Sequence, residues 1–197
     1  MREMINMIVV LTVLSAFSGG LLAAVRTGTK DRIEQQVLKF QKAPAIKQIL
    51  SDVSNDPLQD RFKLMDKEQE LTFFVGKHGG KPDAVSFETT GKGFGGDIGV
   101  MVGVNIESDA IIGICVTTHS ETPGIGSRAK DDPKFAAQFA GMTMDKNFAT
   151  KKDGGDVDAM SGATVTSRGV SVAAQQAQDI YKRLKPEIQK QAALMAK

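Results

Sequence analysis

The 197-residue sequence contains no tryptophan, one tyrosine and one cysteine. A chain whose only thiol is Cys115 can form no internal disulfide and cannot hold an iron–sulfur cluster with four cysteines of its own. The two histidines, His78 and His119, argue against a structural zinc site. Cys115 lies in the apolar run 111–116, so we expect a small buried side chain there. Redox chemistry in this chain would therefore require a bound organic cofactor.

The charges of the chain are nearly balanced, with 25 basic against 23 acidic residues and a net charge of +2. The basic residues are spread along the sequence and do not form the cluster that nucleic-acid-binding domains usually carry. Ten phenylalanines and a single tyrosine also provide little material for a base-stacking surface. We therefore expect no nucleic-acid partner.

Residues 4–25 contain no charged side chain and are long enough for a helix that crosses a hydrocarbon core of about 30 Å. The alternative is a cleaved signal peptide, whose apolar core usually spans only about 7–15 residues. The sequence before Arg26 lacks a good small-x-small cleavage site. We expect residues 1–26 to be a transmembrane anchor with a short N-terminal flank.

The charges beside this span do not decide its orientation. Arg2 precedes it, whereas Arg26, Lys30 and Arg32 follow it, which taken alone would place the C-terminal domain in the cytoplasm. Long domains, however, can be translocated largely regardless of such charges.

Beyond the span, the sequence changes from helical to strand-like patterning. Residues 30–50 have helical apolar spacing that is interrupted at Pro44, and the turn sequence 54–57 marks a boundary, so we expect a helical connector over 27–60. Apolar runs separated by Gly, Pro, Asn and Asp then predict strands, and helical spacing returns near Thr164. The strands are expected at residues 71–76, 84–90, 98–106 and 110–119. Residues 61–197 are thus predicted to form an α+β domain, an antiparallel sheet with flanking helices.

A glycine-rich segment, Gly91–Gly96, matches the dinucleotide pattern G-x-G-x-x-G. That pattern binds a pyrophosphate when a helix follows the glycines, but here residues 98–106 read as another strand. A hairpin turn is the better interpretation. Its glycines could still let a flat ligand approach the backbone.

Two further segments contain candidate binding groups. In 119–126, Pro123-Gly124 ends a strand with a turn, and Glu121 and Thr122 could hydrogen-bond to a heterocycle, although from these residues alone an ordinary strand-ending turn is the favoured interpretation. In 158–168, Thr164 and Thr166 lie near the start of the long helix, where free amides and the helix dipole favour a phosphate. Helix capping by Ser or Thr is the alternative there.

Taken together, these segments resemble a known family. Ser161–Ser167 (SGATVTS) resembles the attachment sequence of FMN-binding domains, His119–Arg128 (HSETPGIGSR) resembles their upstream ETPG segment, and residues 91–105 resemble their glycine-rich hairpin. The family includes the G subunits of Rnf ion-translocating electron-transport complexes. The resemblance covers the membrane span and roughly residues 70–185.

The resemblance implies one FMN per chain, esterified through its phosphate to the second threonine of the motif, Thr166, by a flavin transferase. Other residues of the two motifs are implied to build the attachment loop or to lie beside the flavin. These cofactor-binding residues are Glu121, Thr122, Pro123, Gly124, Ser161, Gly162, Ala163 and Thr164.

The implied function is that of an electron carrier within a membrane-bound ion-translocating oxidoreductase complex, beside other membrane and redox subunits. The chain itself is expected to turn over no substrate. The family places its domain on the periplasmic side of the inner membrane, which we adopt over the charge bias because the domain is long. Two alternatives are the C subunit of the sodium-pumping NADH:quinone reductase, which tends to be longer, and a membrane-tethered binding module without flavin.

Overall fold

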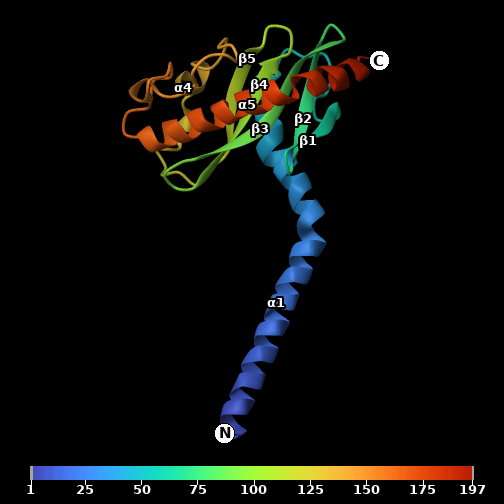
Figure 1. Cartoon of the computed structure of the whole chain (residues 1–197), viewed down its shortest axis with the longest axis vertical. Helices are drawn as coiled ribbons and strands as arrows, with labels where there is room; N and C mark the ends of the chain where they lie inside the picture. Colours follow the sequence, from blue (N-terminus) through green and yellow to red (C-terminus); the bar gives the residue numbers. More distant parts are fainter. Residues whose placement is uncertain (1, 197) are drawn as a thin grey trace. The chain divides into compact units, whose positions relative to one another are not determined.

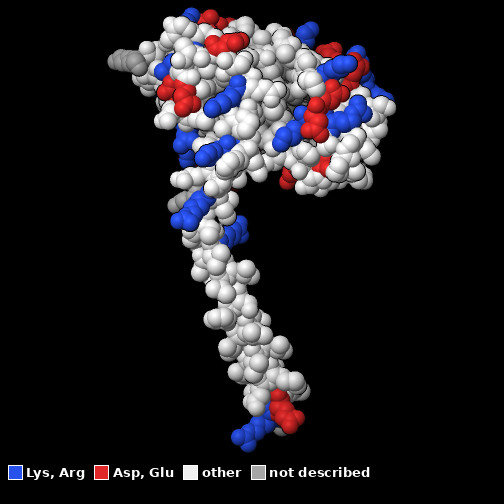
Figure 2. Space-filling model, turned by 180° about the vertical axis from the view of Figure 1, so that it is seen from behind, with Lys and Arg blue, Asp and Glu red and all other residues white. Residues whose placement is uncertain are grey.

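The computed structural model describes residues 2–196, which form two compact units that divide between Phe40 and Gln41. The N-terminal unit is dominated by helix α1, Arg2–Val37. Its segment Arg2–Lys30 is long and apolar enough to cross a membrane, and its large apolar side chains are exposed. Figure 2 shows this segment as a stretch of uncharged surface with charged side chains near both ends. Such a helix suits the apolar interior of a bilayer.

The regular helix changes character next to Pro44, as the sequence predicts. A π-helical turn, Leu38–Lys42, comes first, and helix α2, Ala43–Ile49, begins with the proline in its first turn. Proline has no backbone N–H and removes one bond of the helical ladder, so an irregular turn at this place has a direct local cause. Ala43, Ala45, Ile46 and Ile49 are buried, which makes α2 part of the folded domain. The division of the chain at residues 26 and 60 stays a prediction.

The domain is built on a five-stranded antiparallel sheet with the order β1-β2-β3-β4-β5. Four of its strands were predicted from apolar runs, whereas β1 was not, because this edge strand buries little besides Phe62. The predicted α+β fold with an antiparallel sheet is confirmed. The strands are β1 Arg61–Asp66, β2 Gln69–His78, β3 Lys81–Lys92, β4 Asp97–Asn105 and β5 Ala110–Thr118.

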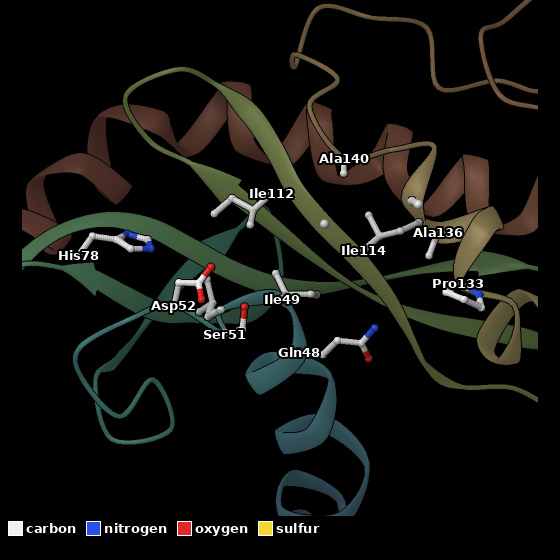
Figure 3. Close-up of a pocket in the computed structure, with 13 residues that line it drawn as sticks. Gln48, Ile49, Ser51, Asp52, His78, Ile112, Ile114, Pro133, Ala136 and Ala140 are labelled. Carbon is white, nitrogen blue, oxygen red and sulfur yellow. The ribbon is translucent and has the colours of Figure 1, made fainter.

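Helices cover both faces of this sheet. The long helix α5, Thr164–Leu194, lies across one face, and α2 packs on the opposite face (Figures 1 and 3). Phe73, Phe87 and Tyr181 are fully buried between the sheet and α5. The remaining short helices lie in the connection between β5 and α5; they are α3 Arg128–Asp131, α4 Pro133–Ala137 and the 3-10 turn Lys151–Asp153.

The glycine-rich segment forms the predicted hairpin turn. Lys92 at the end of β3 pairs with Asp97 at the start of β4, and Gly93 donates a backbone hydrogen bond to Gly96 at 2.8 Å. Strand β4 follows the glycines where dinucleotide binding would require a helix. In Figure 1 this hairpin lies beside the N-terminal end of α5. The topology thus brings residues 93–96 to the predicted attachment sequence.

Candidate functional site

The predicted attachment sequence forms the entry into α5. Gly162 has a φ of +79°, a left-handed conformation that favours glycine, and the helix begins at Thr164. Among the residues that the structure describes, no side chain caps the N-terminal amides of α5, whose N-cap position is Ala163. The first turn therefore keeps free donors and the positive end of its dipole, both of which attract an anion. The alternative prediction, a Ser or Thr side chain that caps the start of α5, is therefore wrong, since the N-cap residue is Ala163.

Ser167 fixes this loop from inside the helix. Its hydroxyl accepts a hydrogen bond from the Met160 amide at 2.9 Å and donates one to the Ala163 carbonyl, also at 2.9 Å. Ser167 is fully buried. The motif SGATVTS contains this residue, but its role was not predicted, because a serine at this place offers no signal that separates loop bracing from helix formation.

Thr166 and Glu121 meet at the centre of the site. The Thr166 hydroxyl donates a hydrogen bond to Oε2 of Glu121, and Oε1 of Glu121 accepts one from the Gly95 amide at 2.7 Å. Only 2% of Thr166 and 6% of Glu121 are exposed. The backbone N–H of Glu121 in turn donates to Nδ1 of His119 at 3.2 Å. Three segments that are distant in sequence, the β3–β4 hairpin, the loop 119–127 and the start of α5, therefore converge on one carboxylate.

Glycines make this convergence possible. A Cβ on Gly126 would lie 2.6 Å from Oε2 of Glu121 and 2.9 Å from Oγ1 of Thr166, closer than real Cβ contacts. A Cβ on Gly93 would likewise crowd Oε1 of Glu121, at 2.5 Å. Neither glycine was singled out from the sequence. Both lie inside glycine-containing motifs, which is the only sign of their importance in the sequence. The folded chain shows that they lie against the Glu121 carboxylate.

The other predicted residues of the ETPG segment lie on the surface beside this centre. Thr122, Pro123 and Gly124 are exposed, and the Thr122 carbonyl accepts hydrogen bonds from the Ile125 and Ser127 amides, each at 3.2 Å. Ser161 and Gly162 are exposed as well, Thr164 is half-buried and Ala163 is buried. The structure thus brings Glu121 into contact with Thr166 and places Thr122–Gly124 as an exposed turn on the same loop.

Exposed apolar side chains occur on each of the three converging segments. Phe94 in the hairpin is 77% exposed, Ile125 in the loop 50% and Val165 in the first turn of α5 44%. Each is the sequence neighbour of a residue at the centre of the site: Phe94 of Gly95, Ile125 of Gly126 and Val165 of Thr166. None of the three was predicted from the sequence, since a single apolar residue between two glycines or two threonines gives no clear pattern.

Two arginines support the attachment sequence. Arg128 donates from Nη1 to the Ser161 carbonyl at 3.2 Å, which places a cation beside the loop. Arg168 donates from Nε and Nη2 to the two carboxylate oxygens of Asp153, each at 2.7 Å. The Arg168 guanidinium and the Thr150 hydroxyl lower the pKa of Asp153 to about 2. These contacts tie the start of α5 to the chain that precedes it.

Cys115 does not take part in this centre. Its thiol lies near the Gln48 side chain of α2, 3.5 Å from Oε1. The side chain is half-buried, which corrects the expectation of a fully buried residue, because β5 turns Cys115 toward an incompletely covered part of the sheet. Burial still raises the pKa of the thiol above its usual value, so it is a weak source of thiolate.

A cavity of about 370 Å³ lies elsewhere, on the side of the sheet that faces away from α5 (Figure 3). Figure 3 shows Ile49 of α2, Ile112 and Ile114 of β5, and Ala136 of α4 around it, with Asp52 and His78 at one end. None of the predicted site residues lines it. No sequence pattern indicates this cavity, because its walls come from separate elements without a shared motif.

Comparison with known proteins agrees with this geometry. The sequence model of the FMN-binding domain matches residues 93–179, a range that contains both Glu121 and Thr166. The chain is 34% identical over 172 residues to the G subunit of the ion-translocating oxidoreductase complex of Salmonella typhi, covering 82% of this chain and 83% of the relative. This chain belongs to the G-subunit family of ion-translocating oxidoreductase complexes. The Escherichia coli K12 relative is 33% identical with the same coverage, and the Vibrio atlanticus relative is 33% identical over 85% of each chain.

Two solved structures share the fold of this member of the G-subunit family. The C subunit of the Na(+)-translocating NADH-quinone reductase from Parabacteroides distasonis superposes with a TM-score of 0.52 at 24% identity, covering 68% of this chain and 71% of that chain. NqrC of Shewanella oneidensis gives 0.50 at 24% identity, covering 71% and 73%. The predicted resemblance to Rnf G subunits is confirmed, whereas these two structures document the fold. The exposed apolar helix α1 fits a membrane anchor by its length and composition.

Proposed function

We propose that this member of the G-subunit family carries electrons through one FMN bonded by a phosphoester to Thr166, within a membrane-bound ion-translocating oxidoreductase complex. The observation that carries the proposal is the contact between the two family motifs. Thr166 of the attachment sequence stands in the first turn of α5 and binds Glu121 of the ETPG segment, inside the range matched by the FMN-binding domain.

The residues present suit a phosphate at the start of α5. The uncapped amides of the described first turn, the positive end of the helix dipole and the nearby Arg128 all favour an anion. Thr166 supplies the hydroxyl for the ester bond. Because this hydroxyl is buried, part of the surrounding loop has to move before a phosphate can reach it.

The surroundings also suit a flat heteroaromatic ring. Phe94, Ile125 and Val165 present apolar surface around the attachment residue, and the turn Thr122–Gly124 offers exposed backbone groups. FMN supplies one-electron chemistry when bound, while the protein provides its position and its electrostatic surroundings. We place Glu121 and residues 122–124 beside the flavin, and Ser161–Thr164 around its phosphate.

Covalent attachment also agrees with a location outside the cytoplasm. A non-covalent FMN lost on the periplasmic side of the inner membrane would find no cytoplasmic pool to replace it. In this proposal α1 anchors the chain in the membrane and the domain lies on the periplasmic side. A flavin transferase attaches the FMN to the domain. Other membrane and redox subunits of the complex deliver and accept the electrons. The chain relays electrons between these partners and turns over no soluble metabolite.

The relay role is tested in membranes that contain the assembled complex. Thr166→Ala should stop ferredoxin- or NADH-linked electron flow while the other subunits remain present on immunoblots. Thr166→Ser keeps a hydroxyl at the same place and is the matched control, in which electron flow should persist. Undiminished electron flow in Thr166→Ala would show that this flavin is not on the path.

A further inference from the structure

Glu121 is held by hydrogen bonds at both oxygens of its carboxylate. Oε2 accepts from the Thr166 hydroxyl, and Oε1 accepts from the Gly95 amide at 2.7 Å. Only 6% of this residue is exposed. Taking a carboxylate out of water costs free energy, and two hydrogen bonds offset only part of that cost. An acidic side chain in this position therefore indicates a chemical role at the hydroxyl it binds.

We infer that Glu121 is the proton acceptor for the Thr166 hydroxyl during flavin attachment, an inference that rests on the proposed ester at Thr166. A threonine hydroxyl is a weak nucleophile at neutral pH, and proteins activate such groups with an adjacent base within hydrogen-bond reach. Glu121 meets this geometric requirement, since its Oε2 already receives the Thr166 proton in a hydrogen bond. The base thus belongs to the protein that is modified.

The co-reactant of the step is a flavin dinucleotide, in which a pyrophosphate joins FMN to an adenylate half. Oγ1 of Thr166 forms a new bond to the phosphorus of the FMN half, and the hydroxyl proton moves to Glu121. The P–O bond to the adenylate half breaks, and adenosine monophosphate leaves with the electron pair of that bond. Glu121 then returns its proton to the leaving group or to water, so no oxidant or reductant is needed.

The bond to Gly95 explains how the carboxylate stays in place while the site opens. Residues 122–125 are the exposed part of the loop that carries Glu121. Glu121 is fastened separately, through its side chain, to the β3–β4 hairpin. A loop movement that leaves this hydrogen bond intact would therefore keep the proton acceptor beside the hydroxyl.

The test uses the full chain, solubilised in detergent, purified from cells without flavin transferase and incubated with purified transferase and flavin dinucleotide. The rate of attachment is read by intact mass. Glu121→Gln keeps the size of the side chain and an oxygen that can accept from the Gly95 amide, but its amide group cannot take the proton, so attachment should slow by ~10²-fold or more. Glu121→Ala should be equally slow and should be accelerated by added formate, a small carboxylate that can occupy the vacated space. Glu107→Gln, an exposed carboxylate paired with Lys81, is the matched control and should react like the parent.

The outcomes separate this inference from the proposal on which it rests. If the parent chain gains no flavin mass at Thr166, the proposed function is wrong. If the parent is modified and folded Glu121→Gln reacts within about threefold of its rate, Glu121 is not the proton acceptor, because such catalysis contributes at least ~10²-fold. Should Glu121→Gln fail to fold by circular dichroism, the Glu121→Ala variant decides: acceleration by formate supports the inference, and a formate-independent rate equal to that of the parent overturns it.

Discussion

A Cβ on Gly91 would overlap the backbone carbonyl oxygen of Gly169. The end of β3 therefore touches the second turn of α5 backbone to backbone, and a Cβ on Gly169 would in turn lie 2.8 Å from the Lys92 carbonyl oxygen. Thr89 strengthens the same contact, since its hydroxyl donates to the Ala173 carbonyl at 2.8 Å. This close approach sets the distance between the hairpin that holds Gly95 and the turn that holds Thr166.

Gly91→Ala should consequently destabilise the domain, because β3 and α5 have to separate to admit the methyl group. We expect a loss of about 3 kcal/mol or more in the free energy of unfolding, at the upper end of the usual cost of overpacking. Gly113→Ala in β5 is the matched control, since its Cβ would meet only Ile49 Cγ1 at an ordinary 3.9 Å. Chemical denaturation of both variants measures the difference, and equal stability would show that the contact at Gly91 is relaxed in solution.

Gly126→Ala should impair flavin attachment more than it impairs folding. The added methyl group would press on Oε2 of Glu121 and on the Thr166 hydroxyl, and so displace the reacting groups from each other. Displacements of about 1 Å in a reacting pair can slow a reaction by roughly 10²-fold. Fluorescence of the denatured chain per mole of protein, together with a thermal unfolding curve, checks this. A fully flavinylated Gly126→Ala chain would mean that the space beside Thr166 is larger than the structure indicates.

The Asp153–Arg168 ion pair should make the stability of the domain depend on pH in the acidic range. Because the pKa of Asp153 is lowered from 3.8 to about 2 in the folded state, its contribution to stability is complete above the ordinary value and is lost as the pH falls toward 2. Arg168→Gln removes the larger cause, so the pKa should rise toward 3.8 but stay below it, since Thr150 still donates to Asp153. Carboxyl carbon NMR shifts during an acid titration report this pKa. A value that stays near 2 in the variant would assign the shift to another group.

Much of this arrangement follows from the sequence, for identifiable physical reasons. The central strands are long apolar runs bounded by turn residues, so periodicity locates them, and the strand after Gly96 identifies the hairpin. Strand β1 is not predicted, because an edge strand with one buried side chain, Phe62, shows little alternation of apolar and polar residues.

The centre of the site is predictable only in part. Motif resemblance selected Thr166 and Glu121, but these residues are 45 positions apart, and only the fold shows that their side chains bind each other. The roles of Gly126, Ser167 and Phe94 depend on three-dimensional proximity to that pair, which neither composition nor spacing records. The cavity of Figure 3 depends in the same way on the packing of α2 and α4 around β5.

The membrane anchor and its proposed orientation can be tested together. Leu14→Arg should weaken insertion, since a charge at the centre of a span costs roughly 2.5–3.5 kcal/mol on insertion scales. Leu14→Phe, which keeps the span apolar, should remain in the membrane fraction. Protease added to spheroplasts should digest the domain of the parent chain. Complete protection until lysis would place the domain in the cytoplasm, in agreement with the positive charges that follow the span.

The covalent bond at Thr166 is the central claim, and mass spectrometry of the full chain, purified from its native membrane and then denatured, tests it most directly. We expect an intact-mass increase equal to FMN less one water, located on the peptide that contains Thr166, together with in-gel flavin fluorescence. Thr166→Ala should lose both signals, whereas Thr164→Ala should keep some modification. A parent chain of unmodified mass, or flavin that remains bound to denatured Thr166→Ala, would contradict the account.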